Sequence, residues 1–188
     1  PALAADMACR DAVVAQSKNG VYAAMYTAAL IASAAVLPRP CEWVEEAMKQ
    51  IPLKSRLYHE LSLLLSQWRD GASWEALEEA IHGKYKEEDH FDWCLAIPNA
   101  LIVTACVLCF GQDYSEAVIH AVLTGFDTDC NGATVGSIAG IACGADKIPD
   151  KWKTPVQQII CSSVNSYTRI PVEKIVKRTI AVSRTLRP

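Results

Sequence analysis

The sequence predicts an all-α protein, a compact multi-helix bundle formed by a single domain over residues 1–188. Three observations predict this class. Apolar residues recur at helical spacing in most segments. Proline and glycine separate these segments, and no segment shows convincingly the alternation that indicates a strand. A chain of 188 residues has the length of one domain and can bury a sizeable core.

Helices are expected in the first half of the chain wherever an apolar pattern runs between two breaks. Asn19-Gly20, Pro38, Pro52 and Asp70-Gly71 supply the breaks. Ser73 has the residue type and position of a helix N-cap. The expected helices cover residues 3–15, 21–37, 42–50, 55–68 and 74–81.

In the second half, a polar loop is expected over residues 82–93. Pro98 fits the first turn of the helix that follows it. Small residues dominate a later helix, and the segment around Trp152 is expected to be irregular. The expected helices cover residues 99–110, 114–123, 132–144, 156–164 and 171–184.

The composition is that of a globular protein, with 51% hydrophobic and 21% charged residues. A net charge of -3 and a pI near 5.8 argue against a nucleic-acid surface, which needs a basic stripe. The longest uncharged run, residues 21–37, is near the lower length limit for a membrane span. Because it contains tyrosine, threonine and serine and lacks flanking basic clusters, it is interpreted as a buried helix. No nucleic-acid or membrane partner is therefore expected.

Most of the eight cysteines lie in apolar stretches. Small secreted disulfide scaffolds instead place cysteines in polar, loop-rich sequence. The cysteines are therefore interpreted as buried thiols in a reducing compartment, and a cytoplasmic location is expected. Cys106 and Cys109 form a CxxC, but without a second pair or a suitably spaced histidine, so we interpret them as helix core rather than a metal or redox site. No signal-peptide pattern is visible.

A candidate metal site lies at Asp127-Thr128-Asp129. Two carboxylates two residues apart in an irregular segment can converge on one hard cation such as magnesium or calcium. The alternative is a simple N-cap loop, in which Asp129 or Asn131 caps the next helix.

Four glycines follow at four-residue spacing: Gly132, Gly136, Gly140 and Gly144. On a helix they form one stripe without side chains. Each disfavours the helix by about 0.5–1 kcal/mol relative to alanine, so close packing of another backbone or helix is expected to offset them. The helix is therefore expected to be central and to hold the acidic segment rigidly.

These residues carry a resemblance to a known family. The run Gly125-Phe-Asp-Thr-Asp-Cys-Asn-Gly-Ala-Thr-Val-Gly-Ser-Ile-Ala-Gly140 resembles the C-terminal metal motif of the ADP-ribosylglycohydrolase (crystallin J1-like) family. The resemblance extends over nearly the whole chain. Further similar stretches are Arg10-Asp11-Ala12, Asn19-Gly20-Val21-Tyr22, Ile51-Pro52-Leu53-Lys54-Ser55-Arg56, Pro98-Asn99-Ala100 and Ile148-Pro149-Asp150-Lys151-Trp152.

The resemblance implies an all-α hydrolase that cleaves the N- or O-glycosidic bond between ADP-ribose and a protein side chain or a small molecule. It implies a pair of magnesium ions, with Asp127, Asp129 and Cys130 supplying one side of the site. Because sulfur is a poor magnesium ligand, two roles stay open for Cys130, its backbone carbonyl as a ligand or no ligand at all.

The resemblance also implies a substrate pocket shaped by Asn99, Tyr22, Gly125 and Phe126. For Asn99 the alternative role is a helix cap, and for Tyr22 it is a core aromatic. No catalytic residue is assigned, because the general base is expected in an N-terminal part of the family fold.

The sequence also departs from the family pattern. The family's N-terminal Thr-Asp-Asp cluster has no counterpart here, so the chain is interpreted as the C-terminal portion, with at most a partial magnesium site. Ala15-Gln16 stands where the family usually has Ser-His, and Leu95 stands where a histidine often lies. Both positions are expected to contact the substrate, so both departures are expected to lower ligand affinity or activity.

Three functional hypotheses follow. The first is a hydrolase of ADP-ribosyl linkages, acting on an ADP-ribosylated protein or a small-molecule ADP-ribose conjugate. The second is a non-catalytic helical protein of the same fold, structural or ADP-ribose-binding. The third is assembly, in which the chain pairs with a second chain or forms a homo-oligomer because apolar surface would otherwise be exposed.

Overall fold

The computed structural model describes residues 1–88, 92–156 and 158–185. Contacts divide the chain into two compact units, unit 1 (Pro1–Lys147) and unit 2 (Ile148–Pro188). Each unit is described by itself. The chain is predominantly helical, which confirms the all-α prediction. That all 188 residues act as one domain stays a prediction.

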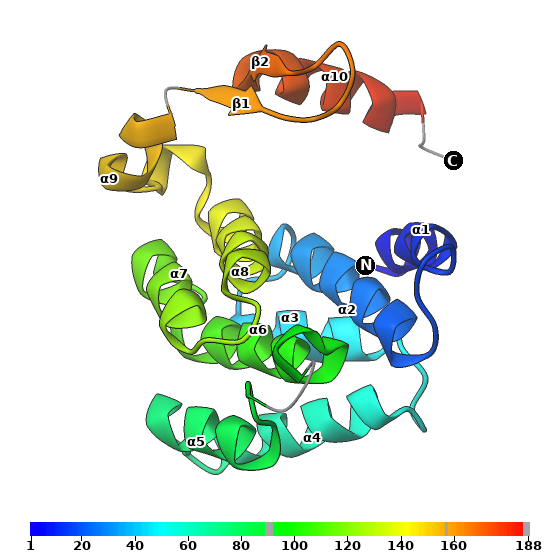
Figure 1. The fold of residues 1–188 in the computed structure, drawn as a ribbon, viewed down its shortest axis with the longest axis vertical. Coiled ribbons are helices and arrows are strands. Elements are labelled where there is room, and N and C mark those ends of the chain that lie inside the picture. Colours follow the sequence, from blue (N-terminus) through cyan, green and yellow to red (C-terminus); the bar gives the residue numbers. More distant parts are fainter. Residues whose placement is uncertain (89–91, 157, 186–188) are drawn as a thin grey trace. The chain divides into compact units, whose positions relative to one another are not determined.

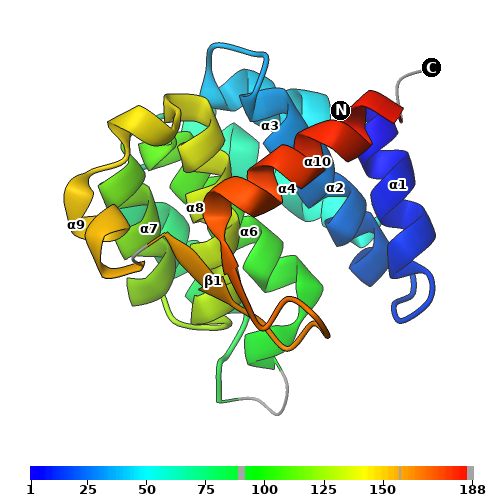
Figure 2. The ribbon, with the colours of Figure 1, turned by 90° about the horizontal axis from the view of Figure 1, so that it is seen from above.

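Unit 1 is helical throughout its described elements and runs from blue to yellow in Figure 1. These elements are α1 (Ala2–Ala12), α2 (Asn19–Ala34), α3 (Pro40–Met48), α4 (Arg56–Arg69), α5 (Trp74–Lys84), η1 (Asp92–Cys94), α6 (Ala96–Phe110), α7 (Tyr114–Leu123), α8 (Thr128–Cys143) and η2 (Ala145–Lys147). Figure 2 shows α7, α8, α2 and α1 side by side, and each neighbouring pair in that order is in contact.

Helix α6 lies at the centre of unit 1. It contacts α2, α3, α4, α5, α7 and α8, and it is apolar around its whole circumference, as a fully buried helix must be. Its buried polar group is satisfied, because the Thr104 Oγ1 lies 2.8 Å from the Tyr26 hydroxyl and 2.6 Å from the Ala100 carbonyl. Every element that carries the candidate site therefore rests against one rigid helix.

The CxxC cysteines lie in α6, as the helix-core interpretation predicts. Cys106 is fully buried and Cys109 is half-buried against the core. Burial is the main cause that raises the pKa of both thiols, that of Cys109 to about 11. Both therefore remain neutral at physiological pH.

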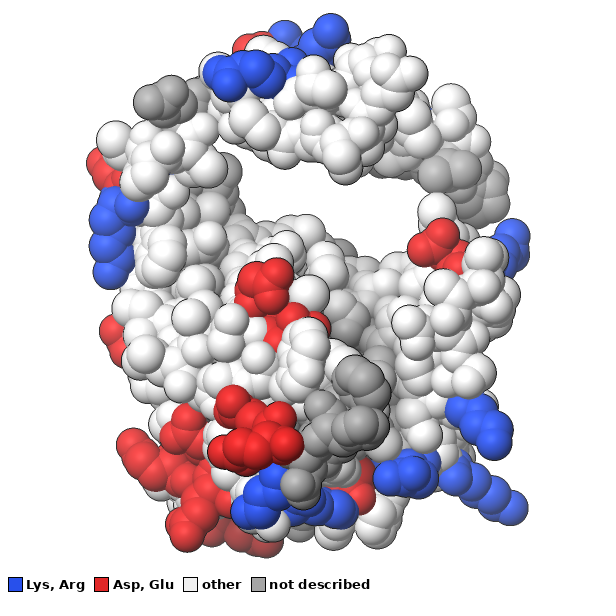
Figure 3. Space-filling model, viewed as in Figure 1, with Lys and Arg blue, Asp and Glu red and all other residues white. Residues whose placement is uncertain are grey.

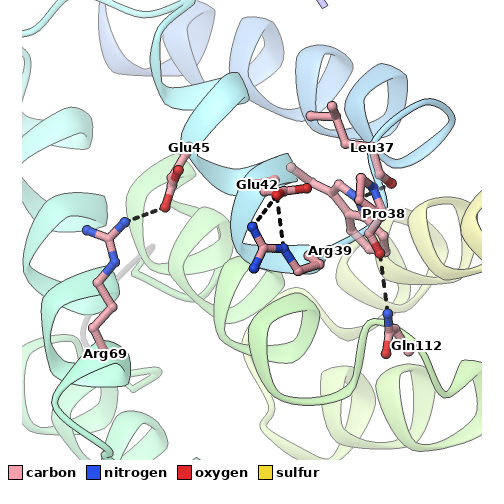
Figure 4. A network of polar contacts seen from close by, with 8 residues as sticks. Leu37, Pro38, Arg39, Glu42, Glu45, Arg69 and Gln112 are labelled. Carbon is pink, nitrogen blue, oxygen red and sulfur yellow. Dashed lines mark hydrogen bonds and ion pairs between the residues drawn. The ribbon is translucent and has the colours of Figure 1, made fainter.

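The corner between α2 and α3 is fixed by a buried tryptophan. The Trp43 indole N–H donates to the Leu37 carbonyl over 2.8 Å, and the residue is 1% exposed. Figure 4 shows exposed polar contacts in the same region: Arg39 with Glu42, Arg69 with Glu45, and Gln112 with the Pro38 carbonyl. Exposed pairs of this kind contribute at most about 1 kcal/mol each, so the buried indole is the main anchor.

Several helix boundaries differ from the sequence prediction. Helix α7 has both predicted ends, and Ser73 caps α5 by accepting from the Ala76 N–H. Asn19, expected in a break, instead starts α2, because the positive φ of 47° at Lys18 makes the turn one residue earlier. Of the loop predicted over residues 82–93, the start belongs to α5 and the end to η1, while residues 89–91 lie outside the described residues.

Unit 2 contains α9 (Asp150–Lys153), η3 (Thr154–Val156), β1 (Ile159–Cys161), β2 (Arg169–Pro171) and α10 (Val172–Thr185). The strands pair antiparallel, with Ile160 opposite Ile170. The helix predicted over residues 156–164 is wrong, as is the prediction that the chain has no strand. Positive φ angles at Gln158 and Ser166 break the helical path, and β-branched isoleucines favour the strand between them. The predicted last helix is confirmed to within one residue.

The glycine stripe of α8 receives the side chains of α7 rather than another backbone. A Cβ on Gly132 would lie 3.0 Å from Val122 Cγ2, and one on Gly136 would lie 3.4 Å from the Tyr114 hydroxyl. The close approach predicted for these two glycines is therefore confirmed. The prediction of a close approach is wrong for Gly144, which ends α8 and would have no atom within 4 Å of an added Cβ. Glycine is favoured there by its positive φ of 82° instead.

Within the described ranges, no helix is both long and apolar enough to cross a bilayer.

The burial pattern of α4 allows a matched test of the core. Leu61 is fully buried and Leu63, on the same helix, is 48% exposed. We expect Leu61→Ala to lower the free energy of unfolding by about 2–5 kcal/mol, since it opens a cavity in the core. Leu63→Ala should change it by no more than about 0.5 kcal/mol. Urea unfolding followed by circular dichroism checks both, and equal losses would contradict this assignment of the core.

Candidate functional site

The acidic segment forms the turn between α7 and α8. Gly125 and Phe126 both have positive φ angles, 86° and 57°, and Asp127 is the N-cap residue of α8. A left-handed phenylalanine is strained by about 1–3 kcal/mol and persists only where its surroundings hold it. Here the Phe126 side chain is 7% exposed, and its ring lies 5.0 Å from that of His82.

His82 also holds the turn directly. Its Nε2 lies 3.0 Å from the Thr124 carbonyl. Because a carbonyl only accepts, Nε2 must carry the hydrogen of this bond. A Cβ at Gly125 would lie 2.1 Å from Glu87 Oε1, which is the end of a flexible side chain and can move aside. The turn thus favours glycine at 125 for its positive φ, whatever its role toward a ligand.

Asn99 holds the other side of the turn. Its Oδ1 accepts from the Asp127 main-chain N–H over 3.2 Å and from Asn131 Nδ2 over 2.7 Å. Its Nδ2 donates to the carbonyls of Trp93 and Leu95, each over 2.9 Å. The side chain therefore ties η1 and the start of α6 to the start of α8.

Asp127 does not cap the helix that it begins. Aspartate is among the best N-cap residues, worth about 1 kcal/mol, yet its carboxylate accepts no hydrogen bond from the first turn of α8. Asp129 and Asn131, the caps considered from the sequence, lie inside the helix, because α8 begins at Thr128 instead of 132. The Asp127 carboxylate is thus left available for a ligand.

Asp127, Asp129 and Cys130 come together. One ligand atom from each lies within 4.8 Å of the others, with Asp127 half-buried and the other two exposed. In Figure 3, acidic side chains gather on the face of unit 1 that carries α5 and the start of α8. The two carboxylates are the oxygen donors that magnesium prefers, whereas the thiol is a soft donor that does not fit it. The donor set therefore fits magnesium through the carboxylates alone.

The Cys130 thiol is neutral in this setting. A hydrogen bond to Asp127 is the main cause that raises its pKa, followed by desolvation and by the charges of Asp127 and Asp129. A neutral thiol is neither a nucleophile nor a metal ligand. Without a bound cation, Cys130 thus acts as a hydrogen-bond donor to Asp127.

A cavity of about 420 Å³, here called the acidic cavity, opens beside these residues. Asp127, Cys130 and Asn131 line it from the start of α8. Its opposite wall is the small-residue face of α2, and its end is formed by η1 and the start of α6. The remaining lining residues are Ala23, Ala24, Thr27, Ala28, Ile31, Cys94, Leu95, Ala96, Asn99, Ala100, Val103 and Thr134.

A second cavity of about 510 Å³, here called the basic cavity, shares the wall Cys94-Leu95-Ala96 with the first. Lys18 and Arg56 line it, together with the first residues of α2 and α6. Neither helix start has a side-chain cap. In the first turn of α2 the Gly20 N–H donates to the Ser17 carbonyl, and in the first turn of α6 Pro98 has no N–H. Two uncapped helix N-termini beside two cations form an environment that favours an anion.

The sequence analysis missed the basic cavity. Lys18 and Arg56 are 38 residues apart, and only the tertiary fold brings them together. The link is Asn19, whose Oδ1 accepts from the Leu57 N–H over 3.2 Å and thereby joins the start of α4 to the start of α2. The Asn19-Gly20 pair was visible in the sequence, but as a break and not as a tie between helices.

The other predicted residues lie in different surroundings. Tyr22 is half-buried against the hydrophobic core and lines neither cavity. Gln16 lines the basic cavity, and Leu95 lines both cavities. The substrate-binding roles of Asn99, Tyr22, Gly125 and Phe126 stay predictions.

Unit 2 has a larger groove of about 570 Å³, whose described lining is mostly apolar, with Arg178 as its one charged residue. This described lining offers no carboxylate for a cation. The candidate site therefore lies in unit 1.

Comparison with known protein families identifies one that matches the chain. The model of the ADP-ribosylglycohydrolase family matches residues 1–185, nearly the whole chain, and the chain belongs to that family. This confirms the resemblance drawn from the motif at residues 125–140. The family is one of hydrolases that act on ADP-ribosylated substrates and are generally metal-dependent. No individual curated protein and no solved structure shows a significant match to the chain.

The bond between Cys130 and Asp127 predicts a difference in thiol reactivity. Because the carboxylate raises the pKa of the thiol, the thiolate fraction at pH 8 is lower than for an ordinary cysteine. We expect Asp127→Asn to lower that pKa and speed alkylation of Cys130 by iodoacetamide by up to about tenfold, the effect of one pKa unit. Peptide mass spectrometry measures the rate, with the exposed Cys161 as internal control. An unchanged Cys130 rate would disprove the contact.

Proposed function

We propose that this chain hydrolyses ADP-ribosyl glycosidic linkages, with a divalent cation held at Asp127 and Asp129. The observation that carries the proposal is the shared wall between the two cavities. A cation-binding cavity beside an anion-binding cavity suits a ligand that carries ribose hydroxyls next to a diphosphate. ADP-ribose is such a ligand.

The acidic cavity would receive the distal ribose. The carboxylates of Asp127 and Asp129 would hold the cation, with Cys130 outside its ligand sphere if the cation is magnesium. When bound, magnesium supplies a point of attachment for the ribose hydroxyls and for a water. The same carboxylates favour the positive charge that develops on the ribose as the glycosidic bond breaks.

The basic cavity would receive the diphosphate. Lys18 and Arg56 supply two positive charges, and the starts of α2 and α6 supply N–H groups without side-chain caps. Helix N-termini bind phosphate through these groups and the helix dipole. Binding the diphosphate here would orient the rest of the ligand toward Asp127.

In the reaction, water adds its hydroxyl to the anomeric carbon of the ribose. The bond to the nitrogen or oxygen of the leaving group breaks, and that atom takes up a proton. Among the described residues that line the acidic cavity, Asp127 is the one carboxylate, and we assign it to the cation.

A second candidate function, ADP-ribose binding without catalysis, is favoured by the lining of the acidic cavity. A cavity whose described lining has one carboxylate holds and orients a ligand more readily than it activates water. Leu95 in the wall, where the family often has histidine, points the same way, because an aliphatic side chain transfers no proton. Turnover of an ADP-ribosylated protein separates the two candidates.

A cytoplasmic location is part of the proposal, supported by the eight cysteines, all of which are free. Free thiols persist in a reducing compartment. The proposed partner is an ADP-ribosylated protein or a small-molecule conjugate. A homo-oligomer is also proposed, since Leu3 and Met7 lie one turn apart on α1 and are 58% and 47% exposed.

Calorimetry tests the cation-dependent part of the proposal. We expect ADP-ribose to bind the full chain more tightly with magnesium than without it. The double variant Asp127→Asn, Asp129→Asn should lose this difference, a change of more than about tenfold in affinity. The matched control is Asp70→Asn, Asp146→Asn, which removes two exposed carboxylates that line neither cavity. No binding by the unaltered chain in any condition would refute the proposal.

Charge removal tests the basic cavity. We expect Arg56→Gln and Lys18→Gln each to weaken ADP-ribose binding by about 1.5–3 kcal/mol, the contribution of a charged hydrogen bond. Adenosine, which lacks the diphosphate, should bind both variants as it binds the unaltered chain. Lys54→Gln, an exposed cation that does not line the cavity, is the control. If adenosine and ADP-ribose lose equal affinity, the diphosphate does not bind here.

A further inference from the structure

The side chain of Asn99 has no hydrogen-bonding capacity left for a ligand. A side-chain amide offers two hydrogens and two acceptor sites. In Asn99 both hydrogens go to the Trp93 and Leu95 carbonyls, and both acceptor sites receive N–H groups, from Asp127 and Asn131. The orientation of the amide is fixed by its main-chain partners, because two carbonyls and one N–H cannot be satisfied by the flipped amide.

Both main-chain groups of Asp127 are hydrogen-bonded, and Asn99 holds one of them. The Asp127 N–H donates to Asn99, and the Asp127 carbonyl accepts from the Asn131 N–H over 2.8 Å. Asn131 is 2% exposed and is itself bound to Asn99 through its side chain. The carbonyl bond is the first bond of α8, so the contact particular to this site is the part-buried bond from the Asp127 N–H to Asn99.

The main-chain conformation explains why Asp127 does not cap α8. A capping aspartate has an extended main chain, from which its carboxylate reaches the N–H groups of the first turn. Asp127 instead has a φ of -84° and a ψ of 72°, and with its N–H held by Asn99 its carboxylate lines the acidic cavity. If the hold of Asn99 were lost, the carboxylate could return to the capping position and leave the cavity.

We propose that Asn99 is a positioning residue, which keeps the Asp127 carboxylate in the acidic cavity and away from the helix N-terminus, and that it does not bind substrate. The inference rests on the proposed function in treating Asp127 as a cation ligand, whereas the bond between Asn99 and the Asp127 N–H is independent of it. It replaces the substrate-binding role expected of Asn99. His82, which holds Thr124 on the opposite side of the turn, limits how far the turn can relax.

The test compares three variants of the full chain. Asn99→Ala removes all four bonds. Asn99→Asp keeps the acceptor for the Asp127 N–H and loses the two donors. Tyr26→Phe is the control, since it removes one buried side-chain bond to the same helix, at Thr104, which lines neither cavity. Manganese affinity, measured by electron paramagnetic resonance, reports whether the carboxylates are placed to bind a cation. The rate of amide hydrogen exchange reports whether the Asp127 N–H is still hydrogen-bonded.

We expect Asn99→Ala to weaken manganese binding about tenfold or more, as loss of an orienting partner does. Tyr26→Phe should leave manganese affinity unchanged even where its unfolding midpoint falls as far. Exchange at the Asp127 amide should speed up in Asn99→Ala and slow again in Asn99→Asp, a rescue that a general loss of stability would not produce.

Two results would overturn the inference. One is unchanged manganese affinity in Asn99→Ala, and the other is unchanged exchange at the Asp127 amide. If the unaltered chain binds no manganese, the cation part of the proposed function fails. The Asp127 amide then decides the role of Asn99 alone, because its exchange does not depend on a metal.

Discussion

The burial of α6 is the constraint on which the rest of unit 1 depends. A 15-residue helix that is apolar on every side must be enclosed, and six other helices supply the enclosure. Its two ends are then the only places where polar groups of the helix can reach a ligand. The C-terminal end is closed by the Trp43 ring, which lies against Gly111. At the N-terminal end, residues 94–96 form the common wall of both cavities, Ile97 and Pro98 line the basic cavity, and Asn99 lines the acidic one. The position of the candidate site thus follows from which end of the buried helix stays open.

The acidic turn is built by restraint from two sides rather than by its own preference. In this turn Phe126 has a left-handed main chain, and the Asp127 carboxylate makes no capping hydrogen bond. Both features are locally unfavourable. His82 from α5 and Asn99 from α6 supply the bonds that hold it, and both helices pack on the same core. Local strain at the site is therefore offset by the packing of unit 1, as is common where a side chain must be held ready for a ligand.

Much of this could be predicted from the sequence, and the rest could not, for physical reasons. Helical periodicity gave the helices of unit 1, and the spacing of Asp127 and Asp129 gave the carboxylate pair. The hairpin of unit 2 was missed because three-residue strands carry too little pattern to outweigh apolar runs. The basic cavity was missed because Lys18 and Arg56 are distant in the sequence. They line one cavity in the fold, where the bond between Asn19 and Leu57 joins the starts of α2 and α4. The role of Asn99 needed its four partners, of which the sequence reveals none.

The common wall also bears on how such a protein can change over time. Residues 94–96 line both cavities, so one substitution there alters both together. The far walls are independent, since Ala23, Ala24 and Ala28 of α2 line only the acidic cavity and Arg56 lines only the basic one. Sequence change would therefore proceed more freely at these three alanines, where larger side chains would reshape one cavity alone, than at the common wall.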